Sequence, residues 1–371
     1  MLVRGIGGPF LTVAVLVAVL CALAAEPPQA DARQPRIGEG SCIGMQACGG
    51  LTGRVGDNSC KGNSACLNNS GDIGDNSCNV DNGCLDNRRE IGNGSCGGDC
   101  KANFAEIADN SCNSGGSCTT NRGDIGNGSC NVVETCTENA GKIGDNTCNS
   151  SFACQRNSGE IGDGSCGGRL FGCFDNSGSI GELSCFSGSS CSGNTGKIGD
   201  DSCHGEGRFY DACSRNSGTV GDGSCRGHGA CVDNIGEVGD HSCSAPVPPT
   251  VEFQFHLREA CARNSGTVRD GSCNAPLLLD EDAIDEPRNV CADNSGTIGY
   301  DSCNEFRACY GNGGQVGNTS CNGDLACSLN IGTIRHESCN AFEACLGNTA
   351  TVGNKRCNGS QACIDNTVDI R

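Results

Sequence analysis

The chain has 371 residues, of which 59 are glycine and 35 cysteine, with no tryptophan and a formal net charge of −19. This composition excludes an ordinary core of bulky side chains, and so high a cysteine content is typical of disulfide-rich secreted chains. The negative charge excludes an electrostatic nucleic-acid binder, because no basic surface would displace counterions from phosphate. The charge also disfavours docking on anionic lipid.

The first residues have the pattern of a secretory signal peptide. Arg4 lies in a short positive region, an apolar run follows over residues 9–24, and Ala22-Leu23-Ala24 is a small-residue cleavage site. A membrane anchor is the alternative interpretation, but the run is short and lacks a basic stop-transfer flank. We therefore expect residues 1–24 to be removed and residues 25–36 to form a linker, with no stable membrane insertion after cleavage.

The remainder, residues 37–371, is one cysteine-rich repeat. Loss of Cys21 with the signal peptide leaves 34 cysteines, an even number that favours complete pairing in an oxidising compartment. They form seventeen consecutive pairs, and each of the sixteen arcs between pairs holds eleven residues. The spacing within pairs varies: twelve enclose five residues, and the others enclose three, six, nine or seventeen. The pairs are Cys42 with Cys48, Cys60 with Cys66, Cys78 with Cys84, Cys96 with Cys100, Cys112 with Cys118, Cys130 with Cys136, Cys148 with Cys154, Cys166 with Cys173, Cys185 with Cys191, Cys203 with Cys213, Cys225 with Cys231, Cys243 with Cys261, Cys273 with Cys291, Cys303 with Cys309, Cys321 with Cys327, Cys339 with Cys345, and Cys357 with Cys363.

The contrast between fixed arcs and variable pairs favours one disulfide pairing over another. An arc of constant length must stack on its neighbours in register, since a slip of one residue turns every side chain to the other face. A segment of variable length must project from the stack. A disulfide within each pair would close the base of that projection, and each seven-residue ring would contribute about 2 kcal/mol in the chain-entropy model. The alternative pairing joins the two ends of each arc; we favour the first because it explains where the length varies.

Positions in each arc are counted here from the second cysteine of a pair. Position 3 is Asn in sixteen of seventeen repeats, with Leu51 the exception, and position 7 is always Ile or Val. Position 9 is mostly Asp or Asn and position 11 is mostly Ser, whereas positions 4 and 6 vary. This alternation predicts a strand with one buried face. The stacked Asn side chains are expected to satisfy backbone groups at a repeated turn.

A repeat that buries no core alone must stack with its own copies. We therefore predict an all-β fold, a rod-like β-solenoid of about seventeen coils with an eighteen-residue base period and one disulfide per coil. The hexad Val55-GDNSC resembles the hexapeptide repeat of left-handed β-helices, which favours the left hand. Neither end carries a polar cap, so we expect the strand edges there to self-associate end to end or to bind a partner.

The repeat as a whole resembles a group of uncharacterised secreted proteins rich in Cys, Gly, Asn and Ser. Arcs such as Cys66–Cys78 (CLNNSGDIGDNSC) and Cys213–Cys225 (CSRNSGTVGDGSC) match their SCNG–AC–N–G–IGDNSC pattern, over residues 37–371. The resemblance implies a β-solenoid and carries no known activity. The Cys-x5-Cys spacing is also similar to that of the disulfide-braced insect antifreeze solenoids, whose coil is shorter.

Three long segments lie inside cysteine pairs, at residues 204–212, 244–260 and 274–290. The first two hold an unusual share of the aromatic residues, and loops on a rigid scaffold are where recognition usually occurs. The alternative is that they are tolerated insertions that pack on each other. The candidate partner-binding residues are Phe209, Tyr210, Phe253, Phe255 and His256.

Calcium is the one metal for which the sequence offers candidate ligands. The third long segment holds an acidic cluster whose carboxylates suit Ca²⁺. It lacks the EF-hand spacing, so a solvated acidic loop is the favoured interpretation. The Asp column at position 9 is a second calcium hypothesis, although turn-forming Asx residues explain it more simply. The residues of the cluster are Asp280, Glu281, Asp282, Asp285 and Glu286.

No catalytic motif or other cofactor motif occurs, so we predict a protein that is not an enzyme. Ser and Thr at positions 4 and 6 make a partial hydroxyl column of the kind that ice binding needs, but Gly313 and Ile331 interrupt it and charged residues occupy the N-terminal half. The sequence therefore favours a secreted structural or adhesive rod at the cell surface or in extracellular matrix, with an extracellular protein or glycan as partner. A calcium-binding or ice-binding solenoid is the alternative.

Overall fold

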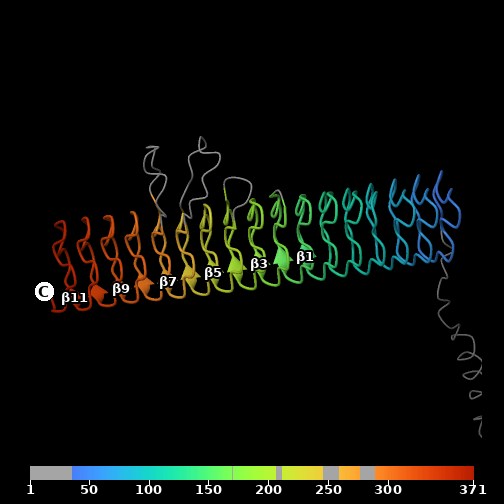
Figure 1. Ribbon diagram of the computed structural model, residues 1–371. Coiled ribbons are helices and arrows are strands. Elements are labelled where there is room, and N and C mark those ends of the chain that lie inside the picture. The colour runs from blue at the N-terminus through green and yellow to red at the C-terminus, as the bar shows by residue number, and fades with distance from the viewer. Residues whose placement is uncertain (1–35, 169, 206–210, 245–258, 276–288) are drawn as a thin grey trace, which may run out of the picture. The chain divides into compact units, whose positions relative to one another are not determined.

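The computed structural model describes residues 36–168, 170–205, 211–244, 259–275 and 289–371. Within the unit Arg36–Arg371, successive coils of the chain stack on one another in sequence order (Figure 1). The described residues contain no helix. The predicted fold class is confirmed: the protein is an all-β, parallel β-solenoid with an eighteen-residue period and one disulfide per coil.

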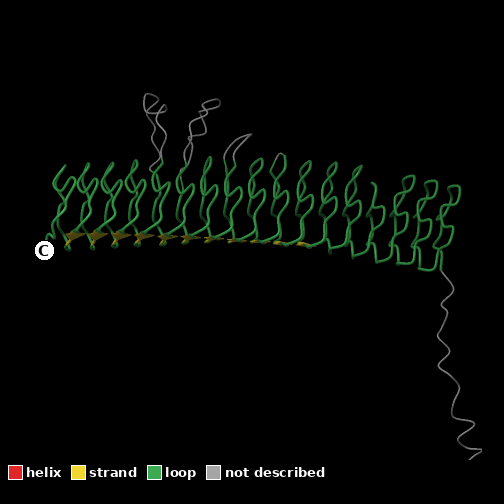
Figure 2. Ribbon diagram, turned by 60° about the horizontal axis from the view of Figure 1, so that its bottom comes forward, coloured by secondary structure: helices red, strands yellow, loops and turns green. Residues whose placement is uncertain are grey.

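One parallel sheet runs along the stack, and each strand pairs with the next in chain order. Figure 2 shows these strands in a row along one side of the coils. Each strand is two residues long and consists of positions 6 and 7 of an arc. The strands are β1 Lys142–Ile143, β2 Glu160–Ile161, β3 Ser179–Ile180, β4 Lys197–Ile198, β5 Thr219–Val220, β6 Glu237–Val238, β7 Thr267–Val268, β8 Thr297–Ile298, β9 Gln315–Val316, β10 Thr333–Ile334 and β11 Thr351–Val352.

The register places every position-7 side chain on the next one. Val220 pairs with Val238, which pairs with Val268. Single bridges extend this aliphatic column to Ile37 at one end and to Ile370 at the other. From Val55 to Val352 the column is at most 3% exposed. The apolar core is therefore this file of Ile and Val together with the disulfides and small residues such as Ala230 and Ala260 beside them, as a sequence poor in large side chains requires.

The regular strands are shorter than the alternation predicts, because the backbone leaves the extended conformation soon after position 7. In the coil that contains β6, His241 at position 10 and Cys243 have φ values of 52° and 60°. All seventeen first cysteines of the pairs have φ between 54° and 64°. This left-handed conformation costs a residue other than glycine on the order of 1 kcal/mol or more. The arc is thus a short strand followed by two sharp corners.

Seventeen disulfides link the 34 described cysteines, one within each pair, as the variable spacing favours. Their Cα–Cα distances lie between 5.5 and 6.0 Å. Each bridge ties a first cysteine in the left-handed conformation to the second cysteine, where the next arc begins. The covalent ring offsets the local backbone cost because it restricts the unfolded chain.

The predicted pairing is confirmed at every second cysteine, none of which bonds across an arc. The second cysteines, each bonded to the cysteine before it in the chain, are Cys48, Cys66, Cys84, Cys100, Cys118, Cys136, Cys154, Cys173, Cys191, Cys213, Cys231, Cys261, Cys291, Cys309, Cys327, Cys345 and Cys363. The alternative pairing, which joins the two ends of an arc, is therefore wrong.

Buried asparagines at position 3 form a continuous hydrogen-bonded column. Nδ2 of Asn234 donates to Oδ1 of Asn216 at 2.8 Å, and Nδ2 of Asn264 donates to Oδ1 of Asn234 at 2.9 Å. Fifteen such bonds connect Asn69 to Asn366. Nδ2 of Asn234 also donates to the carbonyl of Gly236, two residues on. The Asn column therefore satisfies the turn, as predicted, and also joins the coils.

Position 11 forms a second polar column. The backbone N–H of Ser242 donates to Oγ of Ser224 at 3.1 Å, and Oγ of Ser224 donates to the carbonyl of Gly239 at 2.7 Å. One hydroxyl thus accepts from and donates to the following coil, which only a group with both functions can do.

Removal of one asparagine from the column tests how far it stabilises the stack. Asn234→Leu is expected to leave Asn216 Oδ1 and Asn264 Nδ2 each short of a buried partner. The local opening free energy should fall by about 2 kcal/mol, which makes backbone amide exchange in the adjacent coils about 30-fold faster. Native-state hydrogen exchange measures this. The control Ser217→Ala alters an exposed neighbour of the column, so its exchange should change less than about twofold; equal rates in both variants would contradict a stabilising role.

Candidate functional site

The five candidate partner-binding residues and the five candidate calcium ligands lie outside the described residues. Phe209 and Tyr210 fall in the gap at 206–210, and Phe253, Phe255 and His256 fall in the gap at 245–258. The acidic residues Asp280, Glu281, Asp282, Asp285 and Glu286 fall in the gap at 276–288. The partner-binding and calcium hypotheses on these segments therefore stay predictions. The structure does describe the bases from which the three long segments leave the stack.

The Cα–Cα distance across the disulfide is nearly the same whether the segment that it encloses is short or long. Cys243–Cys261 and Cys273–Cys291 each enclose seventeen residues, with Cα–Cα distances of 5.5 and 5.7 Å. Cys225–Cys231 encloses five residues at 5.7 Å. The coil therefore meets its neighbours in the same way with a short or a long segment.

Arginine–aspartate ion pairs between residues at position 2 link neighbouring coils near these disulfides. Arg215 Nε donates to Asp233 Oδ1 at 2.6 Å and its second nitrogen donates to Oδ2 at 2.9 Å. Arg263 makes the same fork with Asp293, at 2.6 and 3.1 Å. Bidentate pairs of this kind are the strongest geometry for an arginine and a carboxylate. A third fork joins Arg156 to Asp175.

The forks change the ionisation of their carboxyl groups. The hydrogen bond from Arg215 lowers the pKa of Asp233 below its usual range, although partial burial opposes this. The hydrogen bond from Arg263 lowers the pKa of Asp293 in the same way. The same bonds raise the pKa values of Arg215 and Arg263. All four side chains are therefore charged across the neutral range.

The acidic residues at position 9 bond to the neighbouring coil and not only within their own turn. The backbone N–H of Asp200 donates to Asp222 Oδ1, and that of Asp222 donates to Asp240 Oδ1, both at 2.9 Å. His336 takes the same role, since its Nδ1 accepts from the Asn318 amide at 2.9 Å. Each side chain thus caps the backbone of the preceding coil, which explains why Asp, Asn and His share the position.

The described residues do not bring carboxylates together as a calcium site needs. The groups of three potential ligands that lie within 4.8 Å in this part of the chain consist of cysteine sulfurs, such as those of Cys148, Cys154 and Cys166. These sulfurs are in disulfides. A metal site requires thiolates, so these groups do not offer one while they are oxidised.

The exposed side of the sheet carries the side chains of positions 4 and 6. Thr219, Thr297 and Thr333 lie there in the register set by the strands. A shallow hollow of about 470 Å³ opens on this side between β7 and β10, around Gly313. The hydroxyl column of the ice-binding alternative is thus present in part and is broken by this hollow.

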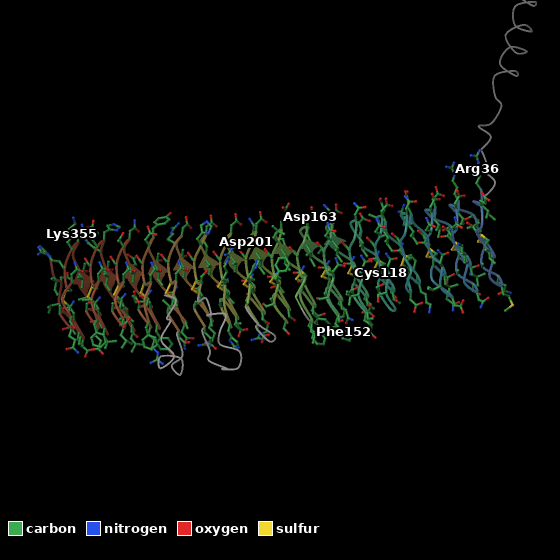
Figure 3. The ribbon with its side chains drawn as sticks, turned by 90° about the horizontal axis from the view of Figure 1, so that it is seen from above. Arg36, Cys118, Phe152, Asp163, Asp201 and Lys355 are labelled. Atoms are coloured by element: carbon green, nitrogen blue, oxygen red, sulfur yellow. A yellow bond between two sulfur atoms is a disulfide. The ribbon has the colours of Figure 1, made fainter. Side chains whose placement is uncertain are left out.

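An aromatic cluster lies on another side of the coils, where the repeat pattern predicted no site. The rings of Phe152 and Phe171 stack with centroids 5.2 Å apart, and Phe174 meets Phe171 edge-on at 6.0 Å. The guanidinium of Arg156 lies 4.2 Å from the Phe174 centroid. Figure 3 shows Phe152 at the edge opposite Asp163. The signal was a phenylalanine inside each of two consecutive cysteine pairs.

One partly buried histidine has a changed ionisation. His228 lies in the segment between Cys225 and Cys231, and burial lowers its pKa, against the attraction of Asp211. At neutral pH this side chain is therefore uncharged within the edge of the stack.

The fold and these surfaces define a class: a disulfide-rich parallel β-solenoid in which variable segments leave a constant scaffold. The chain matches the family described as "Domain of unknown function (DUF7640)" at residues 21–101, 97–208 and 282–371, about three quarters of its length. The protein therefore belongs to this family. Comparison with curated proteins and with solved structures gives no match. Within the described residues, no helix has the length and apolar character needed to cross a membrane.

The forks predict a specific pH dependence. Because the pKa of Asp293 is lower in the folded chain, its stabilisation is present above the unfolded pKa of about 3.9 and is lost as the pH falls through the folded value. The pair is partly exposed, so Asp293→Asn should cost less than about 1 kcal/mol at pH 7. Thermal unfolding should show a small decrease in the midpoint at pH 7, and the decrease should shrink as the pH falls below about 4. Asp365→Asn is the control, because the residue at position 2 of the preceding coil is Gly347 and not an arginine. An equal decrease in the midpoint of this variant would contradict a stabilising role for the fork.

Proposed function

We propose that this protein is a secreted structural or adhesive rod that presents interaction segments at the cell surface or in extracellular matrix. The observation that supports this best is the constant disulfide base: segments of five and of seventeen residues leave the stack from Cα–Cα distances of 5.5 to 5.7 Å. Such a scaffold tolerates new segments without a change in the coils beneath.

The chemistry of the stack also suits an extracellular location. Seventeen disulfides require an oxidising compartment to form and persist, and residues 1–24 have the pattern of a signal peptide. Buried Asn and Ser columns and a disulfide in each coil make a scaffold that resists local opening. These properties favour a load-bearing or displaying role without catalysis. The proposed partner is an extracellular protein or glycan that contacts the long segments.

Shortening the long segments tests the adhesive role. In one variant, residues 244–260 are replaced by the five residues of 226–230, and residues 274–290 by the five of 304–308. The disulfide bases accept either length, so we expect the thermal midpoint to stay within a few degrees. Binding of the labelled protein to cells and decellularised matrix of the producing organism should be lost, because the candidate aromatic and acidic residues of these two segments are gone.

The matched control exchanges residues 226–230 for the sequence of 304–308, which leaves every length unchanged. It should bind as the natural protein does. If the shortened variant is folded and still binds the same cells and matrix, the long segments are not the adhesive surface and the proposed function fails.

A further inference from the structure

At positions 4 and 6, the exposed side of the sheet divides into a charged part and an uncharged part. At position 6, all seven coils from Arg54 to Glu160 carry a charged residue: Arg54, Asp72, Glu90, Glu106, Asp124, Lys142 and Glu160. Five later consecutive coils carry none at this position: Thr267, Thr297, Gln315, Thr333 and Thr351. Position 4 of those five coils is also uncharged, and charge returns only at Asp369, in the last coil. In a chain of net charge −19, this stretch is the part of the sheet suited to a neutral ligand.

The hollow lies within the uncharged part. Its volume is about 470 Å³, within the range of small-ligand sites. Its rim combines hydroxyls, one carboxamide and one apolar side chain. The rim residues are Thr267, Ser295, Thr297, Gln315, Ile331 and Thr333.

Gly313 lines the hollow without a side chain, and the fold does not force a glycine there. A Cβ on Gly313 would lie 3.6 Å from Ile331 Cγ2 and 3.6 Å from Ser295 Oγ, which is ordinary contact. By contrast, a Cβ on Gly266 would lie 2.0 Å from the carbonyl oxygen of Gly296. The stacking of coils therefore requires glycine at residue 266, whereas at residue 313 it leaves room for a Cβ.

We propose that this hollow binds a neutral saccharide chain. Each Ser or Thr hydroxyl both donates and accepts, as sugar hydroxyls do, and Gln315 offers both functions in one carboxamide. Ile331 is 65% exposed and supplies an apolar wall for the C–H face of a sugar ring. The absence of charged side chains at positions 4 and 6 over these coils matches a ligand without carboxylate or sulfate. A flat ice surface fits less well, because the hollow interrupts the hydroxyl column.

This inference goes beyond the proposed function, since the site lies on the constant arcs and does not use the long segments. It is tested by sedimentation of the full-length protein with insoluble cellulose, chitin and β-1,3-glucan, with a soluble sulfated glucan as the charged comparison. We expect at least one neutral polymer to bind and the sulfated polymer not to compete. Gly313→Thr fills the hollow and should weaken binding about tenfold or more through steric conflict with the sugar.

Two controls separate binding from folding. Gly115→Thr adds the same side chain where a Cβ has no neighbour within 4 Å, so it should bind as the natural protein does. The thermal midpoint of Gly313→Thr should match that of the natural protein, since a Cβ at this residue makes only ordinary contacts. Thr297→Glu is a second variant, which brings the charge of the N-terminal coils to the rim and should also weaken binding.

The outcomes distinguish this proposal from the others. If none of the neutral polymers binds, or if Gly313→Thr and Thr297→Glu bind as well as the natural protein, the saccharide site is wrong. Thermal hysteresis that increases in Gly313→Thr would assign this surface to ice and overturn the proposal. The variant with shortened long segments should keep its saccharide binding, so a failure of the adhesive role leaves this result intact.

Discussion

The structure depends on side chains that hydrogen-bond to their own copies. A carboxamide has a donor and an acceptor at one end, so an asparagine at position 3 accepts from the coil on one side and donates to the coil on the other, as Asn234 does between Asn264 and Asn216. The serine hydroxyl at position 11 meets the same condition. A shift of one residue would break both columns and the aliphatic file together. Register is therefore enforced at three places in each coil, although each coil buries only one aliphatic side chain at position 7.

The corners of the coil explain why the cysteines lie where they do. Each first cysteine has a positive φ, which is unfavourable for a residue with a side chain, and each is covalently closed to the second cysteine. The disulfide holds this corner and also isolates the segment it encloses. The same disulfide ring therefore explains both the constant arcs and the variable pairs. The arc must keep its length to stay in register with its neighbours, whereas the segment inside the ring is free of that requirement.

Much of this could be predicted from the sequence, because a repeat shows its constraints as invariant positions. The asparagine column, the aliphatic file and the parallel stack follow from residues that recur at fixed positions. The strand length did not follow, because residue types as different as His241 and Cys243 adopt the left-handed conformation, which neither residue type indicates in the sequence. The role of the position-9 carboxylates was missed because their partner is a backbone amide in another coil. The cluster of Phe152 and Phe171 was missed because it joins residues inside two cysteine pairs, where the sequence has no column that recurs along the chain.

The same constraints indicate which features of the surface are free to change. A side chain at position 3, 7 or 11 contacts the next coil, so its identity is decided by the stack. A side chain at position 4 or 6 lies on the exposed side of the sheet. Charge is compatible with it there, as Glu160 and Glu237 show on the same sheet. A carboxylate such as that of Asp72 also accepts a hydrogen bond from the backbone N–H of Arg54 in the preceding coil. Packing therefore does not account for the loss of charge from Thr267 to Thr351 at positions 4 and 6, nor for the glycine at residue 313, where a Cβ would make ordinary contacts. Features that the fold permits but does not require are those that a ligand can explain, and in this chain they coincide on one part of the sheet.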